Sequence, residues 1–223
     1  TVGNLAPQRL YLMQLSTTTV PLGPGRTLEM VLPCYLITMS DGRHLLIDSG
    51  YPSDVPPTPG MPPAAQVKPV LEHLGELGLR PADIDLVICT HFDVDHAGYH
   101  DAFPQAEFVV QRRHYEWAKP SNPRTDLARQ HWDQPALHYR LVEGDAELLP
   151  GVTLLETSGH APGHQSVLVH LPQSGPILLA IDAVPLQRMF TPDRPAWPGD
   201  DNADATRAST QKLLDLVTNE GVQ

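Results

Sequence analysis

The segment Thr90–Gly98 most constrains what this chain can fold into, because it places a dense group of ligand-type side chains directly after an apolar strand. Residues 84–91 (IDLVICTH), which lead into this segment, are typical of a buried strand. Its imidazole and carboxylate groups belong to His91, Asp93, Asp95 and His96. Such groups are costly to bury unless something pairs with them, and a cation such as zinc accepts both ligand types. The alternative is a solvated acidic turn with surface histidines.

Two more polar residues follow predicted strands further along the chain. His160 ends the segment 152–160 (VTLLETSGH), in a loop whose glycines and proline can push an imidazole outward. Asp182 closes the apolar segment 176–182 (PILLAID). Taken singly, His160 could be a turn histidine and Asp182 a turn former or a helix cap. Because all these groups follow strands, we expect them to meet at one rim of the fold and to hold a metal.

The order of the predicted elements favours two stacked mixed sheets with helices outside. Strands are predicted over 9–15, 31–39, 43–50, 84–91, 108–111, 152–160, 165–171 and 176–182. Helices are predicted over 67–79 and 203–220. The pair Asp41-Gly42 predicts a hairpin turn, and Asn202 or Asp204 is the expected cap of the last helix.

Two stretches lack a regular pattern. Residues 51–63 are dense in proline and predict a loop, whereas residues 112–142 predict short helices and loops. No linker separates two independent parts, so we expect a single domain over residues 1–223.

Charge and composition exclude several protein classes. Lys plus Arg number 15 and Asp plus Glu number 26, so the formal net charge is −11 and no nucleic acid partner is expected. No apolar run approaches the roughly 18 residues of a membrane span. No leader pattern opens the chain, so we expect a cytoplasmic protein. Cys34 and Cys89 are too few for a disulfide framework and are expected to pack inside strands.

The sequence resembles the metallo-β-lactamase superfamily, and within it the N-acyl homoserine lactonases. The segments that carry the resemblance are CYLITMSDGRHLLIDSGYP, VICTHFDVDHAG, FVVQRRHYEWA, YRLVEGDAELLPGVTLLETSGHAPGHQS and GPILLAIDA. The family fold implied by this resemblance is an α/β (α+β) four-layer αββα sandwich, with two stacked mixed β-sheets, outer helices and two pseudo-symmetric halves. It agrees with the strand order predicted above.

The resemblance also implies a centre of two divalent metal ions, usually zinc, with manganese, cobalt or iron as alternatives. By resemblance, the first ion would bind His91, Asp93 and His160, the second would bind Asp95 and His96, and Asp182 would bridge both. A metal-bridging hydroxide would then open a lactone ring, and Asp95 would pass a proton to the leaving oxygen. His164, in the same loop as His160, is expected to support the loop rather than to bind metal.

Three departures from the family pattern stand out. The family has His-x-His-x-Asp-His, but Asp93 stands where the second His belongs, and a carboxylate can still bind zinc or manganese. Pro185 stands where the lactonases commonly place a Tyr that polarises the lactone carbonyl. The family's last His ligand lies on a strand after the final helix, and the chain stops at Gln223 before it. Since residue 1 is Thr, we expect the chain to be trimmed at both ends.

The expected partner is a small-molecule lactone, most specifically an N-acyl homoserine lactone, with no membrane partner and with a homodimer as the expected assembly. The loop 51–63 with Met61, and residues 114–117 (HYEW), are candidate pocket walls or ordinary packing segments. Three alternatives stay open: another ester, thioester or small-ring lactone hydrolase, a phosphodiesterase, and a non-catalytic member whose metal site has decayed. The net charge of −11 argues against a nuclease, and metal content would test decay.

Overall fold

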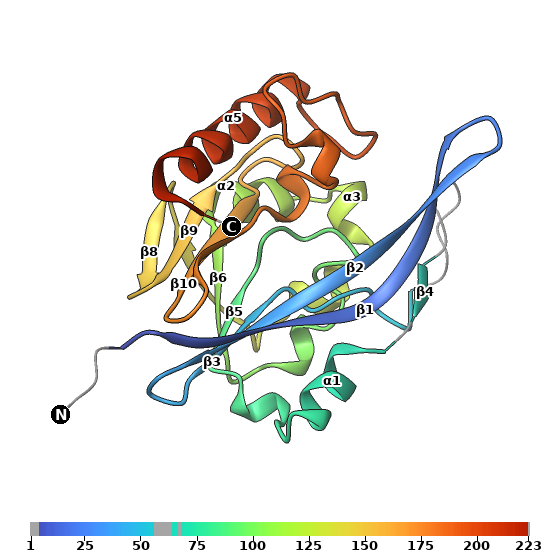
Figure 1. Ribbon diagram of the computed structural model, residues 1–223. Helices are drawn as coiled ribbons and strands as arrows, with labels where there is room; N and C mark the ends of the chain where they lie inside the picture. The colour runs from blue at the N-terminus through green and yellow to red at the C-terminus, as the bar shows by residue number, and fades with distance from the viewer. Residues whose placement is uncertain (1–4, 56–63, 67, 223) are drawn as a thin grey trace.

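The computed structural model describes residues 5–55, 64–66 and 68–222, and Figure 1 shows two sheets with helices packed outside them. The larger sheet has seven strands in the order β4-β1-β2-β3-β5-β6-β7. Its strands are β1 (Pro7–Gly23), β2 (Arg26–Met39), β3 (His44–Ile47), β4 (Ala64–Gln66), β5 (Leu86–Ile88), β6 (Glu107–Gln111) and β7 (His138–Val142). β4, β1, β2 and β3 pair antiparallel, whereas β3, β5, β6 and β7 pair parallel. The carboxyl ends of these parallel strands therefore share one edge.

The smaller sheet has four strands in the order β11-β10-β9-β8. They are β8 (Ala146–Leu149), β9 (Val152–Glu156), β10 (Gln165–Leu171) and β11 (Gly175–Leu179). Every pairing in this sheet is antiparallel, so the expectation of two mixed sheets is correct only for the larger one. The smaller sheet is a meander whose short turns leave no room for the crossover that parallel strands need.

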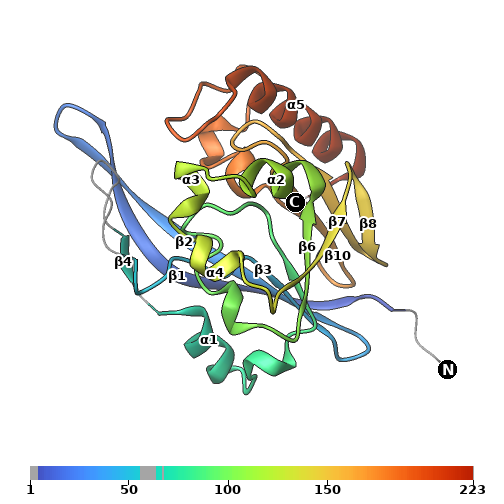
Figure 2. The same ribbon diagram turned by 180° about the vertical axis from the view of Figure 1, so that it is seen from behind.

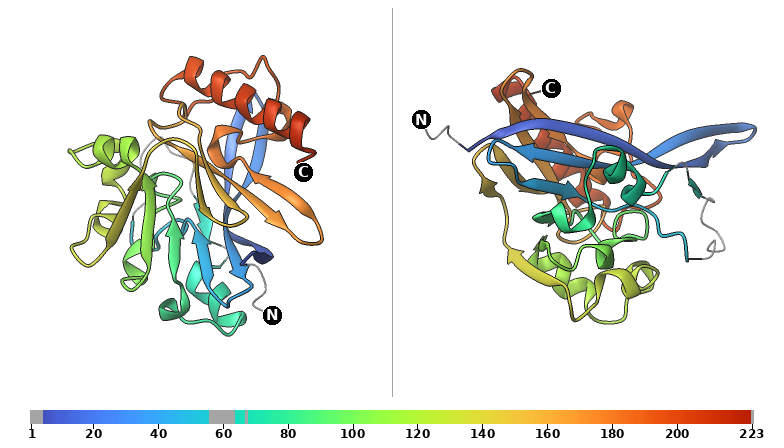
Figure 3. Two further views of the ribbon diagram at one scale, coloured as in Figure 1. Left: turned by 90° about the vertical axis from the view of Figure 1, so that its left-hand side faces the viewer. Right: turned by 90° about the horizontal axis from the view of Figure 1, so that it is seen from below.

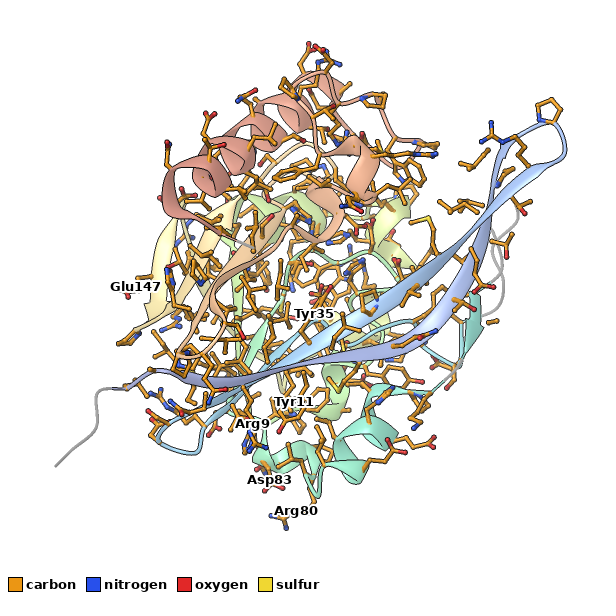
Figure 4. The ribbon with its side chains drawn as sticks, viewed as in Figure 1. Arg9, Tyr11, Tyr35, Arg80, Asp83 and Glu147 are labelled. Atoms are coloured by element: carbon orange, nitrogen blue, oxygen red, sulfur yellow. The ribbon has the colours of Figure 1, made fainter. Side chains whose placement is uncertain are left out.

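The helices lie on the outer faces of the two sheets, as Figure 3 shows for α1 and α5. They are α1 (Val70–Glu76), α2 (Arg112–Ala118), α3 (Pro123–Asp126), α4 (Arg129–Trp132) and α5 (Ala203–Glu220). Four 3-10 turns connect elements: η1 (Pro81–Asp83), η2 (His100–Ala102), η3 (Ile181–Ala183) and η4 (Gln187–Met189). Seen from behind, α2 to α4 lie together on the side of β6 (Figure 2). The Arg80–Asp83 ion pair of η1 lies at the edge away from α5 (Figure 4).

Alternating residues along the strands divide the core into three layers. Leu45 and Ile47 of β3 pack between the two sheets, where they meet Val167 of β10. Leu46, between them in sequence, faces the layer under α1, α2 and α4. Leu168 of β10 faces α5 together with Leu213. This period-two alternation on both sheets produces the expected αββα order of layers.

Several predicted strands differ in extent from the observed ones. The hairpin of β1 and β2 extends far past 9–15 and 31–39, because the Thr-rich residues 16–22 continue the pairing. The segment 152–160 ends as a strand at Glu156, and 176–182 ends at Leu179. Ile181 adopts a left-handed φ of 52°, which breaks the second of these strands, so Asp182 lies in η3 rather than in β11.

Three strands lie outside the predicted set: the short β4, β7 and β8. β7 lies inside the region predicted as helices and loops, and β8 follows it. Both alternate between exposed and half-buried residues and lack the apolar run that marks a buried strand. The helix predicted over 67–79 begins only after Pro69, while Asn202 caps α5 as expected by accepting from the Ala205 N–H at 2.9 Å. None of the helices among the described residues is long and apolar enough to cross a bilayer.

Candidate metal centre

The loop after β5 holds His91 in one defined tautomer. The Thr90 hydroxyl donates to Asp48 Oδ2 at 2.6 Å, because a carboxylate can only accept. The Thr90 oxygen lies 3.0 Å from His91 Nδ1 and accepts from its N–H. The lone pair of His91 therefore lies on Nε2, which is buried and has no hydrogen-bond partner among the described residues. Burying an acceptor without a hydrogen-bond partner costs free energy unless a cation binds its lone pair.

Asp48 fixes His96 in the same way. His96 Nδ1 donates to Asp48 Oδ2 at 2.8 Å, so that Nε2 of His96 turns toward the centre. Asp48 directly follows β3, and the parallel pairing of β3 with β5 brings it beside the loop that carries both histidines. Its φ of 60° is left-handed, a conformation that Asp tolerates better than most residues. The carboxylate thus orients two imidazoles at once.

Asp182 lies at the centre of three imidazoles. Its Oδ2 is 3.2 Å from His160 Nε2, 3.5 Å from His96 Nε2 and 3.7 Å from His91 Nε2. The turn η3 presents this carboxylate, and the preceding Ile181 adopts a backbone conformation that is unusual for a β-branched residue. Two strand-end loops, after β5 and after β9, and one turn therefore converge on one oxygen atom.

Asp93 pairs with an arginine that the sequence did not indicate. Arg124 of α3 donates from Nε to Asp93 Oδ1 at 2.7 Å and from Nη2 to Oδ2 at 2.6 Å. Its Nη2 also lies 2.7 Å from His160 Nε2. Since a guanidinium has no acceptor, His160 Nε2 accepts this hydrogen bond. Asp93 Oδ2 is 3.2 Å from His160 Nε2 and 3.3 Å from His91 Nε2.

The carboxylates and imidazoles shift one another's pKa values. Burial, together with nearby His96, lowers the pKa of His91 to about 3, so its imidazole is neutral and able to bind a metal at neutral pH. Burial would lower the pKa of His96, but the carboxylates of Asp95, Asp182 and Asp48 outweigh it and raise that pKa well above its usual value. Burial also opposes ionisation of Asp182, yet His96 and His160 hold its pKa well below its usual value.

Asp95 behaves differently from the other carboxylates. Burial, reinforced by the charges of Asp182 and Asp93, raises its pKa, although His96 acts in the opposite direction. Its Oδ2 lies 3.6 Å from His96 Nε2. A carboxyl group with a raised pKa beside the centre can hold a proton that its neighbours cannot.

The residues fit divalent metal ions in two overlapping groups. One group is His91, His96 and Asp182, and the other is His91, Asp93 and His160; within each, the ligand atoms lie within 4.8 Å of one another. Imidazole and carboxylate are the donors that zinc accepts, and the unpartnered His91 Nε2 belongs to both groups. In the second group, Arg124 already engages the donors of Asp93 and His160.

The structure therefore brings together all six predicted site residues: His91, Asp93, Asp95, His96, His160 and Asp182. It adds Asp48 and Arg124. Asp48 closes an apolar strand in the sequence IDSG, the same pattern that singled out Asp182. Arg124 has no comparable pattern, because it reaches the centre from a separate helix.

Other candidate residues prove structural. His164 donates or accepts at Nδ1 with the Thr157 hydroxyl at 2.9 Å, and its ring packs 5.0 Å from that of His91. His114 is buried and accepts from the Phe92 N–H at 2.8 Å, so it is no pocket wall. Cys89 is buried and free, which confirms its packing role. The candidate wall residue Met61, and most of the loop 51–63, lie outside the described residues.

The sequence of the chain is similar to one large family of enzymes. The family model of the metallo-beta-lactamase superfamily matches residues 32–220. An N-acyl homoserine lactonase of Bacillus thuringiensis is 32% identical over 229 residues, covering 96% of this chain and 87% of that protein. The N-acyl homoserine lactonase AttM of Azorhizobium caulinodans is 32% identical over 245 residues, covering 96% of this chain and 90% of that protein.

Solved structures match over the same length. A quorum-quenching N-acyl homoserine lactone lactonase superposes with a TM-score of 0.85 at 29% identity, covering 98% of this chain and 91% of that one. An N-acyl homoserine lactone hydrolase, solved with the product N-hexanoyl-L-homoserine at its catalytic metal centre, gives a TM-score of 0.85 at 28% identity, covering 98% and 92%. The similarity therefore includes every strand-end loop that supplies the centre described above.

Proposed function

The chain belongs to the metallo-beta-lactamase superfamily and, within it, to the family of N-acyl homoserine lactonases, and from this premise we propose that it is a metal-dependent hydrolase that opens the lactone ring of N-acyl homoserine lactones. One observation carries the proposal. Three imidazole Nε2 atoms, from His91, His96 and His160, converge within 3.2–3.7 Å on Asp182 Oδ2. A relative of 32% identity is an N-acyl homoserine lactonase, and a structural neighbour of 28% identity was solved with the product N-hexanoyl-L-homoserine at its catalytic metal centre.

We assign the ligands as follows. His91, His96 and Asp182 hold one ion, with Asp95 beside it, and His91, Asp93 and His160 supply the donors for a second ion near Asp182. Zinc is the proposed metal, with manganese, cobalt or iron as alternatives that elemental analysis would distinguish. When bound, such ions supply Lewis acidity and lower the pKa of water toward neutrality.

The protein's own side chains orient the proposed metal ligands and supply the proton for the leaving oxygen. Opening a lactone joins an oxygen atom of water to the carbonyl carbon and transfers a proton to the ring oxygen that leaves. Asp95, whose pKa is raised by burial and by neighbouring carboxylates, holds a proton for that leaving oxygen. Asp48 holds the Nδ1 side of His96 directly and that of His91 through Thr90, so that Nε2 of both imidazoles is directed toward Asp182. Neither role needs a Ser or Cys nucleophile.

A panel of substrates tests the proposed function. The zinc-loaded protein is incubated with N-acyl homoserine lactones of increasing chain length, and ring-opened N-acyl homoserine is measured by mass spectrometry. We expect hydrolysis by the native protein, loss of activity in Asp182→Asn, and unchanged activity in Asp215→Asn, whose site on α5 contacts Gln211. A folded, metal-loaded protein that leaves every lactone intact would overturn the proposal.

Pro185 favours one alternative class of substrate, thioesters or other esters. The lactonases commonly use a Tyr at this position to polarise the lactone carbonyl, and Pro185 has no hydroxyl to donate. A thioester or another ester would need the same metal centre with different carbonyl contacts. Including thioesters in the panel distinguishes this alternative, because faster thioester cleavage would reassign the substrate while leaving the centre as described.

Three broader predictions accompany the proposed function. We expect residues 1–223 to act as one domain, the protein to form a homodimer, and its location to be cytoplasmic. Sedimentation of the purified protein would test the dimer, and limited proteolysis would test the single domain. The expectation of no nucleic acid partner rests on the net charge of −11 and would be checked by a DNA-binding titration.

A further inference from the structure

The guanidinium of Arg124 lies among the donors proposed for the second ion. All of its N–H groups have an acceptor: Asp93 Oδ1 at 2.7 Å, Asp93 Oδ2 at 2.6 Å, His160 Nε2 at 2.7 Å, the His160 carbonyl at 2.7 Å and the Gly199 carbonyl at 2.9 Å. A guanidinium has five N–H donors, so no donor is left over. Every N–H of the Arg124 side chain is therefore hydrogen-bonded, which fixes the guanidinium in one orientation.

These contacts engage the atoms that a metal would need. Both carboxylate oxygens of Asp93 accept from Arg124, and the lone pair of His160 Nε2 points at Nη2. By contrast, His91 Nε2 has no hydrogen-bond partner among the residues that the structure describes. His96 Nε2 faces Asp95 and Asp182, and within the described part of the chain it has no hydrogen bond from an arginine. The group of His91, His96 and Asp182 is thus open to an ion. The group that contains Asp93 and His160 already holds the positive charge of Arg124.

Two elements keep Arg124 in this position. It lies in α3, whose cap residue Asn122 accepts from the Arg124 N–H at 3.1 Å. Its Nη1 is held by the His160 carbonyl, in the loop between β9 and β10, and by the Gly199 carbonyl, in the loop that leads into α5. An ion that takes Asp93 and His160 must separate these charge-assisted hydrogen bonds and repel the guanidinium.

We infer that Arg124 competes with a metal ion for Asp93 and His160, so that the centre binds one divalent ion tightly and a second ion far more weakly. The inference rests on the proposed function only for the identity of the ligand residues. In this assignment, the carboxylate at position 93 and the arginine at position 124 act as a pair, and the guanidinium supplies the positive charge that a second ion would otherwise bring.

Zinc binding to the purified full chain tests the inference. Metal-free protein is titrated with zinc by calorimetry, and the retained metal is measured by elemental analysis after dialysis. The native protein is expected to retain one ion per chain, with the second binding constant at least about tenfold weaker than the first. Arg124→Ala is expected to strengthen the second constant at least about tenfold, because it removes several charge-assisted hydrogen bonds that compete with the ion.

Arg129→Ala is the matched control. Arg129 comes from the next helix, its side chain is 27% exposed against 24% for Arg124, and it pairs with Asp126 and Asp133 outside the centre. This variant is expected to keep the native ratio of the two constants. Arg124→Gln, which keeps amide donors, replaces Arg124→Ala if circular dichroism shows that the alanine variant is unfolded.

Two equal binding constants in the native protein would overturn the inference, whatever the variants do. An unchanged ratio in folded Arg124→Ala or Arg124→Gln would overturn it as well. These outcomes are independent of the proposed function. A protein that binds two equal ions and opens lactones would refute the inference alone, whereas unequal binding without lactone hydrolysis would refute the proposed function alone.

Discussion

Asp48 Oδ2 accepts a hydrogen bond from His96 Nδ1 at 2.8 Å, and this contact decides which imidazole nitrogen of His96 faces the centre. The same carboxylate acts on His91 through the Thr90 hydroxyl, which lies 2.6 Å from Asp48 Oδ2. A single residue that offers no ligand atom itself therefore sets the tautomers of two proposed ligands. Outer carboxylates that orient histidine ligands typically change metal affinity by about 10–100-fold.

Asp48→Asn is accordingly expected to weaken zinc binding by about 10–100-fold while the fold survives. Asn tolerates the left-handed φ of 60°, but it has only one carbonyl oxygen, and the Thr90 N–H, which donates to Asp48 Oδ1 at 2.8 Å, keeps that oxygen on its own side. The NH2 group then faces His96 Nδ1–H, which needs an acceptor. The proton of His96 then moves to Nε2 and the ligand is lost. Calorimetric titration with zinc measures the effect, and an unchanged affinity in a folded variant would show that Asp48 does not orient the ligands.

Metal removal is expected to destabilise the protein. Ions that bind only the folded state stabilise it by about 2.7 kcal/mol at a concentration 100 times the Kd, and for a chain of this size each kcal/mol raises Tm by roughly 2–4 °C. A chelator should therefore lower the Tm of the native protein, and zinc should restore it. In Asp182→Asn the zinc-dependent shift should vanish, whereas Asp215→Asn should keep it. Equal shifts in both variants would exclude Asp182 as a ligand.

Much of the centre was predictable because its residues follow strands. His91, His96, His160 and Asp182 each come after an apolar run, and carboxyl ends of strands collect at one rim. The same reasoning missed Asp48, although it also closes a strand. Its role depends on the parallel pairing of β3 with β5, which a local pattern does not report.

The parts that escaped prediction depend on tertiary contacts. Arg124 reaches the centre from α3 and is recognisable only once Asp93 and the His160 carbonyl are placed around it. The strands β7 and β8 carry exposed residues at alternate positions and hold their place through pairing with β6 and β9. The end of β11 was misplaced because an isoleucine in the left-handed region is improbable from sequence alone.

Acid is expected to destabilise the fold through His114. Burial lowers the pKa of His114 to about 4 in the folded state, against 6.5 as its ordinary value. Between these values the unfolded chain binds a proton that the folded state excludes, so stability is present above pH 6.5 and falls as the pH is lowered toward 4. The limiting slope for one group is ~1.4 kcal/mol per pH unit.

His114→Gln should remove this contribution, because a neutral amide can accept from the Phe92 N–H without titrating. Urea unfolding of metal-free protein between about pH 6 and pH 5 would show the slope of the free energy of unfolding fall by up to ~1.4 kcal/mol per pH unit. The same substitution at exposed His138 on β7 controls for the loss of any imidazole. Identical slopes for native protein and His114→Gln would contradict the prediction.

Gly98 joins the loop of the metal centre to the loop after β3, and its lack of a side chain is required there. The Gly98 N–H donates to the Gly50 carbonyl at 2.9 Å, and a Cβ at position 98 would lie 2.4 Å from that oxygen and from the Pro52 nitrogen. These are backbone atoms that cannot move aside cheaply. Gly98→Ala is therefore expected to cost about 3 kcal/mol or more of the free energy of unfolding and to weaken zinc binding, since His96 lies two residues earlier.

Gly75→Ala in α1 is the matched control for this substitution. A Cβ at position 75 meets nothing within 4 Å among the atoms that the structure describes, so alanine there should raise stability by about 0.5–1 kcal/mol. Both variants restrict the unfolded chain equally, and the difference between them isolates the close approach of the two loops. Urea unfolding of both variants provides the measurement. If Gly98→Ala proves as stable as Gly75→Ala, the contact between the loops does not hold the centre in place.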